Sequence, residues 1–318
     1  MTPQGHGAGL PTQGPGAGLP LIMGVVNVTP DSFSDGGKWF DETTAIGHGL
    51  ELAAAGAALV DVGGESTRPG AVRPDADEEA RRVIPVVRAL AAAGLVVSVD
   101  TMRASIAEAA VAAGARVIND VSGGLADPAM GRVAAECGVT FVVMHWRGHS
   151  ADMQARARYD NVVTEVCREL AARVEELRSA GVAPEHLILD PGLGFAKLPE
   201  HNWELLRNLD SVAALGYPVM VGSSRKRFLG LVGRAEGRER PPTSRDTVTA
   251  ITSAYAAAAR VWCVRVHDVV ATRDAFDVVA ALGPLAPIPV ESPRSAGLIG
   301  QVRPLVPSSA TPGEVSSE

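Results

Sequence analysis

Short apolar runs alternate with longer amphipathic stretches along most of the chain. The runs are continuous and rich in β-branched residues, which is typical of strands buried on both faces of a parallel sheet. They lie at 21–28, 58–62, 96–99, 116–118, 140–144, 186–189, 218–221 and 261–266. The pattern therefore predicts eight buried parallel strands.

A helical pattern follows each of these runs. The stretch 75–93 has acidic residues in its first turn and Gly94 just past its end, as helix termini prefer. The others lie near 41–55, 103–114, 127–136, 161–180, 199–214, 244–259 and 270–282. Eight strands alternating with eight helices predict an α/β fold, a (β/α)8 TIM barrel, which typically needs about 250 residues.

A doubly wound open sheet is the competing architecture for such an alternation. It usually shows Gly-x-Gly-x-x-Gly after its first strand. Here the first strand ends in Val26-Asn27-Val28-Thr29-Pro30, and the chain contains no Walker A sequence. The barrel is therefore the favoured prediction.

Glycine and proline are concentrated at the two ends of the chain. The chain has 318 residues, with 34 Gly and 22 Pro. Residues 1–20 contain no Lys, Arg, Asp or Glu, and residues 283–318 are rich in proline. The composition predicts a single domain at 21–282 between a disordered leader, 1–20, and a disordered tail, 283–318.

Charge and cysteine content exclude several classes of protein. The net charge is −7, and no basic run extends beyond 225–227, which argues against nucleic-acid binding. No stretch of 18 apolar residues predicts a membrane span, and the leader lacks the features of a secretion signal. Three cysteines without paired spacing suit a reduced, cytoplasmic protein.

Polar side chains follow the predicted strands, and in a barrel the carboxyl ends of the strands form the active site. Any one of them is more simply explained as a loop start or a helix cap, but so many on one rim favour a site. The set is Asn27, Asp61, Asp100, Asn119, His145, Asp190, Ser223 through Lys226, Arg265 and His267. Asp61 is its weakest member, because the glycines after it suggest that it anchors a turn.

The types of side chain in this set indicate a ligand. Asp100 and Asn119 can pair with the donor and acceptor edge of a heterocycle, and Asp190 can grip a guanidine-like edge in two places. The chain has 26 arginines and only three lysines, Lys38, Lys197 and Lys226, so each lysine is a candidate for a task that arginine cannot perform, and Lys226 offers the ring a point-charge donor on a long stem. The pattern predicts a flat polar ring bound deep in the barrel.

A second group suits an anion at the mouth of the barrel. Arg68, Arg265 and His267 are cationic donors of the kind that bind phosphate. Asn27 and Asp35 offer the oxygen ligands that Mg²⁺ prefers when it binds together with substrate phosphates. The long polar loops 29–37 and 63–70 read either as exposed turns or as lids that exclude water, and Phe33 favours lids.

Seven segments in order resemble the dihydropteroate synthases, most closely their actinobacterial members. They are 23–37, 61–70, 98–101, 118–121, 190–195, 222–228 and 265–268, so the resemblance extends over about 21–282. One departure lies in the rim segment 144–150, which lacks the Thr-Pro that often follows Gly148 in the family.

The resemblance implies a folate-synthesis transferase and a homodimer. It would join p-aminobenzoate to 6-hydroxymethyl-7,8-dihydropterin diphosphate in an SN1-like reaction with Mg²⁺ at Asn27 and Asp35. Asp100, Lys226, Asp35 and Arg68 would be catalytic. The implied pterin contacts are Asp100, Asn119, Met144, Asp190 and Lys226; the diphosphate contacts are Asn27, Arg68, Arg265 and His267; the p-aminobenzoate contacts are Phe33, Thr67, Pro69, Phe195 and Ser224.

Three alternatives remain open. A corrinoid methyltransferase-like protein would share the pterin-binding barrel but should lack the segments 66–70 and 224–227, which are present. A non-catalytic pterin-binding paralogue should have lost lid or diphosphate residues, and none of those positions is altered. A barrel of unrelated function is the third, because fold alone does not determine chemistry.

Overall fold

The computed structural model describes residue 10 and the ranges 18–29, 42–65, 73–148, 153–234 and 237–283. The chain divides into the units Met1–Leu285 and Ala286–Glu318, and every described residue belongs to the first. The predicted tails therefore lie almost entirely outside the described residues. No helix in the described ranges is long and apolar enough to span a membrane.

Eight parallel strands form the centre of the fold, in the order β6-β5-β4-β3-β2-β1-β8-β7. A parallel bridge between Leu189 and Val219 brings the two ends of this sheet together, so the barrel is nearly closed. The strands are β1 (Leu21–Asn27), β2 (Leu59–Gly63), β3 (Val97–Asp100), β4 (Val117–Asp120), β5 (Thr140–Met144), β6 (Leu187–Asp190), β7 (Met220–Val221) and β8 (Cys263–Val266). The (β/α)8 prediction is confirmed.

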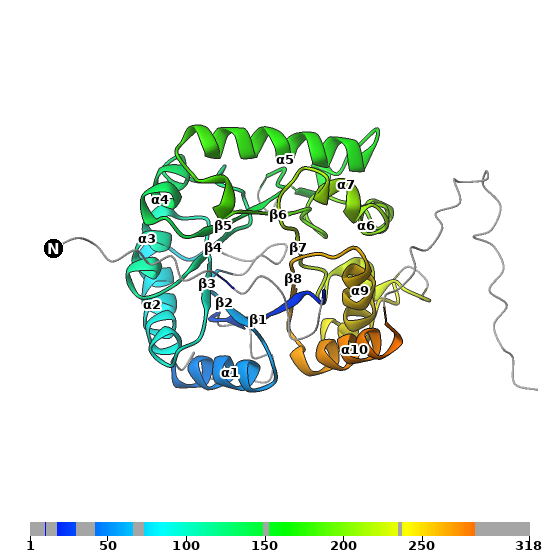
Figure 1. Cartoon of the computed structure of the whole chain (residues 1–318), viewed down its shortest axis with the longest axis horizontal. Coiled ribbons are helices and arrows are strands. Elements are labelled where there is room, and N and C mark those ends of the chain that lie inside the picture. Colours follow the sequence, from blue (N-terminus) through cyan, green and yellow to red (C-terminus); the bar gives the residue numbers. More distant parts are fainter. Residues whose placement is uncertain are drawn as a thin grey trace, which may run out of the picture. The chain divides into compact units, whose positions relative to one another are not determined.

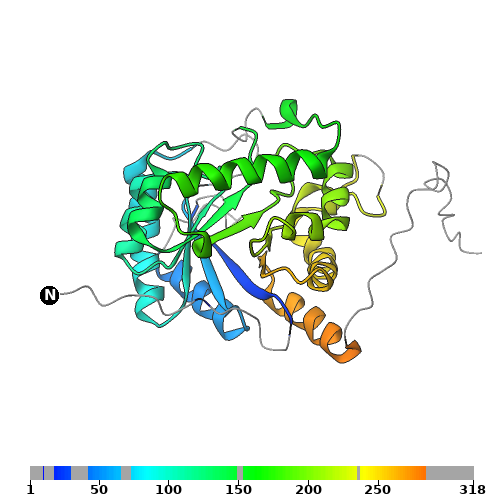
Figure 2. The ribbon, with the colours of Figure 1, turned by 45° about the horizontal axis from the view of Figure 1, so that its top comes forward.

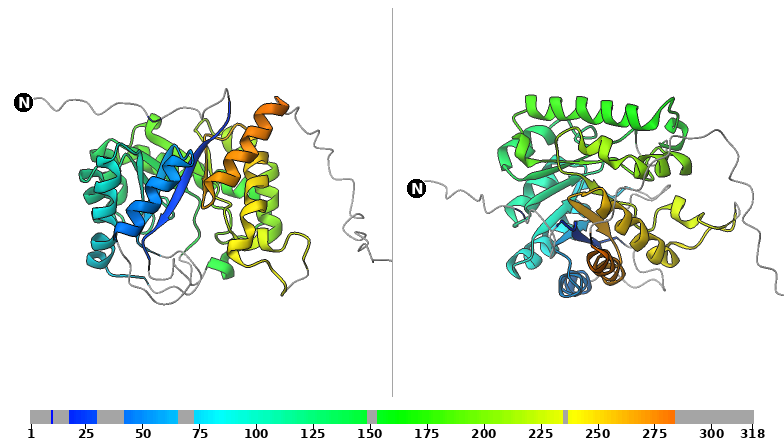
Figure 3. Two further views of the ribbon diagram at one scale, coloured as in Figure 1. Left: turned by 90° about the horizontal axis from the view of Figure 1, so that it is seen from below. Right: turned by 45° about the vertical axis from the view of Figure 1, so that its right-hand side comes forward.

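Helices surround the strands, as Figures 1 and 2 show, and Figure 3 shows β1 beside α1 and α10. Their alternation with the strands matches the predicted order. They are α1 (Glu42–Ala54), α2 (Ala76–Ala92), α3 (Ala104–Ala112), α4 (Met130–Cys137), α5 (Val162–Ser179), α6 (Pro199–Arg207), α7 (Leu209–Ala213), α8 (Arg227–Gly230), α9 (Asp246–Ala258) and α10 (Val269–Leu282), with 3-10 helices η1 (Met153–Arg156), η2 (Pro184–His186) and η3 (Pro242–Arg245).

Short polar side chains cap the N-termini of α2, α5 and α10. The carboxylate of Asp75 accepts from the backbone N–H of Glu78, and Asp268 caps α10 in the same way. The stretch 199–214 was predicted as one helix, and this is wrong in detail. The backbone leaves helical geometry at Asn208, whose side-chain amide donates to the carbonyl of Glu204 at 2.8 Å. Asparagine competes for backbone groups in this way, and α6 ends there.

The interior of the barrel changes from apolar to polar within two residues along four of the strands, β2, β4, β6 and β8. A buried cluster at its centre contains Leu59, Val117, Val142, Ile188 and Cys263 among its members. Because side chains on a strand alternate between faces, the residue two positions further on faces the interior again. Those residues are Asp61, Asn119, Met144, Asp190 and Arg265, and all of them except Met144 are polar. The polar strand ends thus rest directly on an apolar floor.

Candidate active site

A pocket opens at the carboxyl ends of the strands. It combines four ionisable side chains with apolar walls and one glycine, which directly follows β7. Its lining residues are Asp100, Asn119, Val121, Met144, Asp190, Phe195, Gly222, Ser224, Lys226 and Arg265. Eight of these were predicted as site residues, so the structure brings together most of the predicted set that it describes.

Asp61 forms a buried ionic centre at the base of this pocket. Its Oδ2 accepts from Asn119 Nδ2 at 3.0 Å and from Arg265 Nε at 2.6 Å, while Oδ1 has no hydrogen-bond partner among the described residues. Because Asn119 donates its amide N–H to Asp61, its amide oxygen remains available to accept from a ligand. Asp61 is thus more than the turn anchor that its glycine neighbours suggested.

Asp100 is the second carboxylate that pairs with Arg265. Arg265 Nη2 donates to Asp100 Oδ2 at 2.8 Å, and the side chains of both residues are largely buried. Burial raises the pKa of Asp100 to about 7, against the opposing effect of the Arg265 charge. Arg265, which the family resemblance places on a diphosphate, therefore already pairs with two carboxylates in this structure.

Asp190 and Lys226 form the opposite wall. The backbone N–H of Gly192 donates to Asp190 Oδ1 at 2.7 Å, and burial raises the pKa of this carboxyl group. Lys226 Nζ lies 3.7 Å from the centre of the Phe195 ring, a cation–π contact. Burial lowers the pKa of Lys226 to about 8, and the nearby charge of Arg265 lowers it further. Burial therefore shifts the pKa values of both groups toward neutral pH.

Two further predicted residues lie at the rim. His267 donates its backbone N–H to Ser224 Oγ at 3.1 Å, and the same hydroxyl lies 2.8 Å from His267 Nδ1. Asn27 ends β1 beside Gly63, and its side-chain amide forms no hydrogen bond to any other described residue. The five remaining predicted site residues lie outside the described residues: Phe33, Asp35, Thr67, Arg68 and Pro69.

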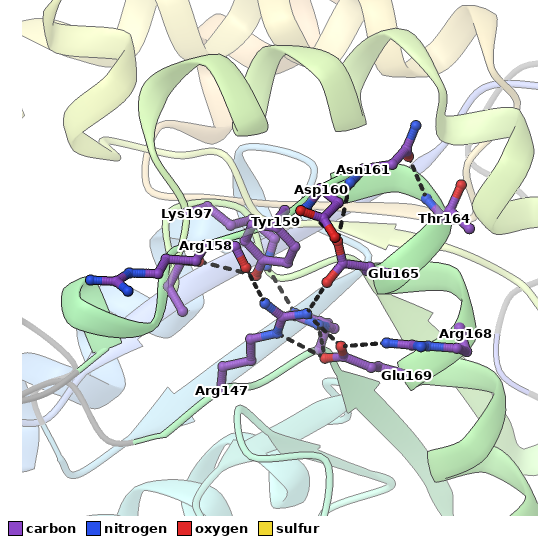
Figure 4. Close-up of polar contacts among 12 residues, drawn as sticks. Arg147, Arg158, Tyr159, Asp160, Asn161, Thr164, Glu165, Arg168, Glu169 and Lys197 are labelled. Carbon is purple, nitrogen blue, oxygen red and sulfur yellow. Dashed lines mark hydrogen bonds and ion pairs between the residues drawn. The ribbon is translucent and has the colours of Figure 1, made fainter.

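A polar network behind the pocket was not predicted as a unit. Figure 4 shows Arg147 close to Glu165 and Glu169 of α5, with Lys197 nearby. His145 joins the network through a 2.8 Å contact between its Nε2 and Glu169 Oε2. The sequence marked His145 as a strand end and Lys197 as a rare lysine, but gave no sign that α5 supplies their partner.

The described residues contain no group of three or more His, Cys, Asp or Glu side chains that could hold a metal ion. A Mg²⁺ ion that binds mainly through phosphates needs few protein ligands, so this finding leaves Asn27 as a suitable single oxygen donor. The fold and the pocket thus define a class: a (β/α)8-barrel enzyme with a buried, charge-paired site at the carboxyl ends of its strands.

Comparison with known proteins narrows this class. The family model described as "Pterin binding enzyme" matches residues 23–267. A dihydropteroate synthase from Mycobacterium leprae is 55% identical over 262 residues, 82% of this chain and 92% of that protein. One from Streptococcus pyogenes is 42% identical over 266 residues, 83% of this chain and 96% of that protein.

Solved structures of dihydropteroate synthases resemble this chain as well. Xanthomonas albilineans dihydropteroate synthase with 4-aminobenzoic acid has a TM-score of 0.77 at 44% identity, covering 83% of this chain and 93% of that one. The same enzyme in complex with 7,8-dihydropteroate has a TM-score of 0.74 at 42% identity, with 83% and 94% covered. The chain belongs to the pterin-binding enzymes and, within them, to the dihydropteroate synthase family.

Proposed function

We propose that this chain joins p-aminobenzoate to 6-hydroxymethyl-7,8-dihydropterin diphosphate, forming 7,8-dihydropteroate and releasing diphosphate. The observation that carries the proposal is the convergence of Asp100, Asn119, Asp190 and Lys226 on one buried pocket. A carboxylate, an amide oxygen and an ammonium together match the alternating donors and acceptors along the edge of a pterin. Relatives of this chain are named dihydropteroate synthase, and one of them is in complex with 7,8-dihydropteroate, the product expected here.

The contacts of each side chain support a specific role in binding. Asp190 uses Oδ1 to hold the Gly192 turn, and Oδ2 lies beside Gly222, where a Cβ would stand 3.6 Å away. Glycine at this position leaves room for a ring to approach the carboxylate. Asn119 offers its oxygen to a ring N–H, because Asp61 occupies its nitrogen. Met144 is buried against Val121 and provides an apolar face for the ring.

The pocket can also stabilise charge. In an SN1-like reaction the diphosphate departs first and positive charge spreads into the pterin, so a buried carboxylate nearby lowers the barrier. Asp100 is suited to this, because Arg265 keeps a share of it ionised despite burial. The arylamine then attacks a cation and needs no strong base. Lids at 29–37 and 63–70 would keep water from the same cation, but most of these residues lie outside the described residues.

We propose Mg²⁺ as the cofactor, with Asn27 and Asp35 as its protein ligands. Bound there, it would neutralise charge on the departing diphosphate. Arg68 and His267 would add cationic or hydrogen-bonding groups at the same rim, and Phe33, Thr67, Pro69, Phe195 and Ser224 would surround p-aminobenzoate. These roles rest on the family motif and on the rim position of the residues that the structure describes.

Diphosphate release tests the proposed function. Purified full-length protein is given the pterin diphosphate and Mg²⁺, with and without p-aminobenzoate. We expect release that depends on p-aminobenzoate. Pterin binding with no release would instead support a non-catalytic pterin-binding protein, and transfer of a methyl group from a folate would support the methyltransferase alternative.

We also propose a homodimer in the cytoplasm. The helices α9 and α10 pack against each other and carry exposed, large apolar side chains. These are Ile251 and Tyr255 on α9, and Val270, Val278 and Leu282 on α10. Exposed apolar surface of this kind often marks an interface. Light scattering after size-exclusion chromatography gives the mass directly, and a monomer at micromolar concentration would contradict the dimer.

A further inference from the structure

Lys197 is a buried lysine outside the pocket. It follows β6 and precedes α6, and its side chain is almost inaccessible, with 4% of the residue exposed. Its ammonium contacts three acceptors: His145 Nδ1 at 3.0 Å, the carbonyl of Gly192 at 3.0 Å and the carbonyl of Phe195 at 3.2 Å. Three donors thus meet three acceptors, which satisfies a protonated lysine completely.

The network behind Lys197 keeps it in place. Because His145 accepts at Nδ1, its proton lies on Nε2 and is donated to Glu169. Arg147 Nε donates to the same Glu169 carboxylate at 3.0 Å and its guanidinium lies 3.9 Å from the centre of the Tyr159 ring. Figure 4 shows this chain of contacts reaching from α5 toward Lys197. A partly buried network whose members are paired with one another restrains the side chains that belong to it.

Two of the three acceptors of Lys197 belong to the turn that forms a pocket wall. Gly192 donates its N–H to Asp190 and accepts from Lys197 through its carbonyl. Phe195, at the other end of the turn, accepts from Lys197 and places its ring against Lys226. The turn packs closely against His145, the residue that follows β5, since a Cβ on Gly192 would lie 2.4 Å from the carbonyl oxygen of His145.

We propose that Lys197 is a positioning residue for the active site: its ammonium holds the 192–195 turn, and thereby sets the Asp190 carboxylate and the Phe195 ring from behind the pocket. The inference rests on the proposed function for its substrates. A tetrahedral ammonium fits three converging acceptors, whereas a planar guanidinium is too wide for a site this closed. A methionine would fill the space but leave the acceptors unpaired.

Binding of 7,8-dihydropteroate, measured by calorimetry, tests the proposal without requiring turnover. We expect Lys197→Met to weaken binding roughly tenfold or more, and to raise the KM for p-aminobenzoate more than it lowers kcat, because the turn loses its orientation. Lys197→Gln retains two N–H donors and should lose less. Arg168→Met is the matched control, since Arg168 contacts Glu169 from an exposed position and should leave binding unchanged.

A second comparison separates positioning from simple stabilisation. If Lys197 acts through Phe195, Lys197→Met should cost much less affinity in a Phe195→Leu background than in the wild type. A lower melting temperature with unchanged affinity and unchanged KM would overturn the proposal, as would full additivity of the two changes. If Lys197→Met does not fold, Lys197→Gln carries the same tests. A wild-type protein that fails to bind dihydropteroate would count against the proposed function instead.

Discussion

Arg265 and Asp100 are joined across the interior of the barrel. Arg265 Nη2 on β8 donates to Asp100 Oδ2 on β3 at 2.8 Å, and β1 and β2 separate those two strands in the sheet. The contact therefore links two strands that are not neighbours in the sheet. It also opposes the effect of burial on Asp100, because a nearby cation favours the ionised carboxylate.

We predict a bell-shaped dependence of kcat/KM on pH. Asp100 has a pKa raised to about 7 and is protonated below it, which removes the charge that opposes the developing cation. Lys226 has a pKa lowered to about 8 and becomes neutral above it, which removes a donor. Activity should therefore fall on both sides of this window. Steady-state kinetics across pH check this, and a profile that is flat from about pH 5 to pH 9 would contradict it.

Arg265→Met should move the acid limb of that profile to higher pH. The Arg265 charge lowers the pKa of Asp100, so its removal raises the pH at which Asp100 ionises. Arg234→Met, an exposed arginine after α8, should leave the limb in place. An unchanged acid limb in Arg265→Met would show that Asp100 does not control it.

Asp61→Asn should destabilise the fold by about 3 kcal/mol, because it removes one of the two carboxylates that compensate the buried charge of Arg265. The same change removes a negative charge that raises the pKa of Asp100, so the acid limb should move to lower pH. Urea unfolding measures the first effect and kinetics the second. Asp210→Asn, at an exposed position of α7, is the control for both. Wild-type stability would contradict the role of Asp61.

Lys226→Arg should lower kcat/KM at least tenfold, or about 1.4 kcal/mol. The stem of Lys226 passes so close to Gly194 that a Cβ there would lie 2.8 Å from the lysine Cδ. A wide guanidinium at the end of that stem cannot take the place of a narrow ammonium against Phe195. Arg227→Lys, at the exposed neighbouring position, should have wild-type kinetics. Wild-type kinetics for Lys226→Arg would remove Lys226 from the site.

Gly192→Ala should destabilise the fold by about 3 kcal/mol or more, since it combines an unfavourable backbone conformation with a steric clash. Gly192 has a φ of +68°, and its Cβ would meet the His145 carbonyl oxygen. Gly216→Ala separates the two effects, because Gly216 has a φ of +87° and nothing within 4 Å of its Cβ. We expect only about 1 kcal/mol there. Equal losses would indicate that the contact with β5 is unimportant.

His145 should make stability depend on pH in the acid range. Its pKa is lowered from 6.5 to about 4 by burial and by the Lys197 charge, so the unfolded chain takes up a proton that the folded chain does not. The contribution of His145 to stability should fall by about 3 kcal/mol as the pH falls from 6.5 to 4, and the difference between wild type and a His145 variant isolates it from the carboxyl groups that titrate in the same range. His145→Asn should flatten this part of the profile, whereas the exposed His48→Asn should not. Parallel wild-type and His145→Asn profiles would refute the assignment.

Most of the architecture could be predicted because it depends on local pattern. Continuous apolar runs gave the strands, and the polar residue at the end of each run gave much of the pocket. Contacts between distant residues could not be read in this way. Asp61 and Arg265 are 204 positions apart, and nothing near either residue identifies the other.

The network at Lys197 shows the same limit. A lysine in an arginine-rich chain hinted at a special site, but its environment depends on how α5 packs over the strand ends. The break between α6 and α7 at Asn208 was also missed, because a single side chain competing for backbone groups is a weak signal beside a continuous helical pattern. The predicted lid residues Phe33, Asp35, Thr67, Arg68 and Pro69 remain predictions.

The most direct test of the proposed function compares two products in one reaction. Purified protein is given both substrates and Mg²⁺, and diphosphate and 7,8-dihydropteroate are quantified together by coupled assay and mass spectrometry. We predict equal amounts of the two, and a loss of both in Asp100→Asn. Diphosphate without dihydropteroate, or bound pterin with neither product, would contradict the account.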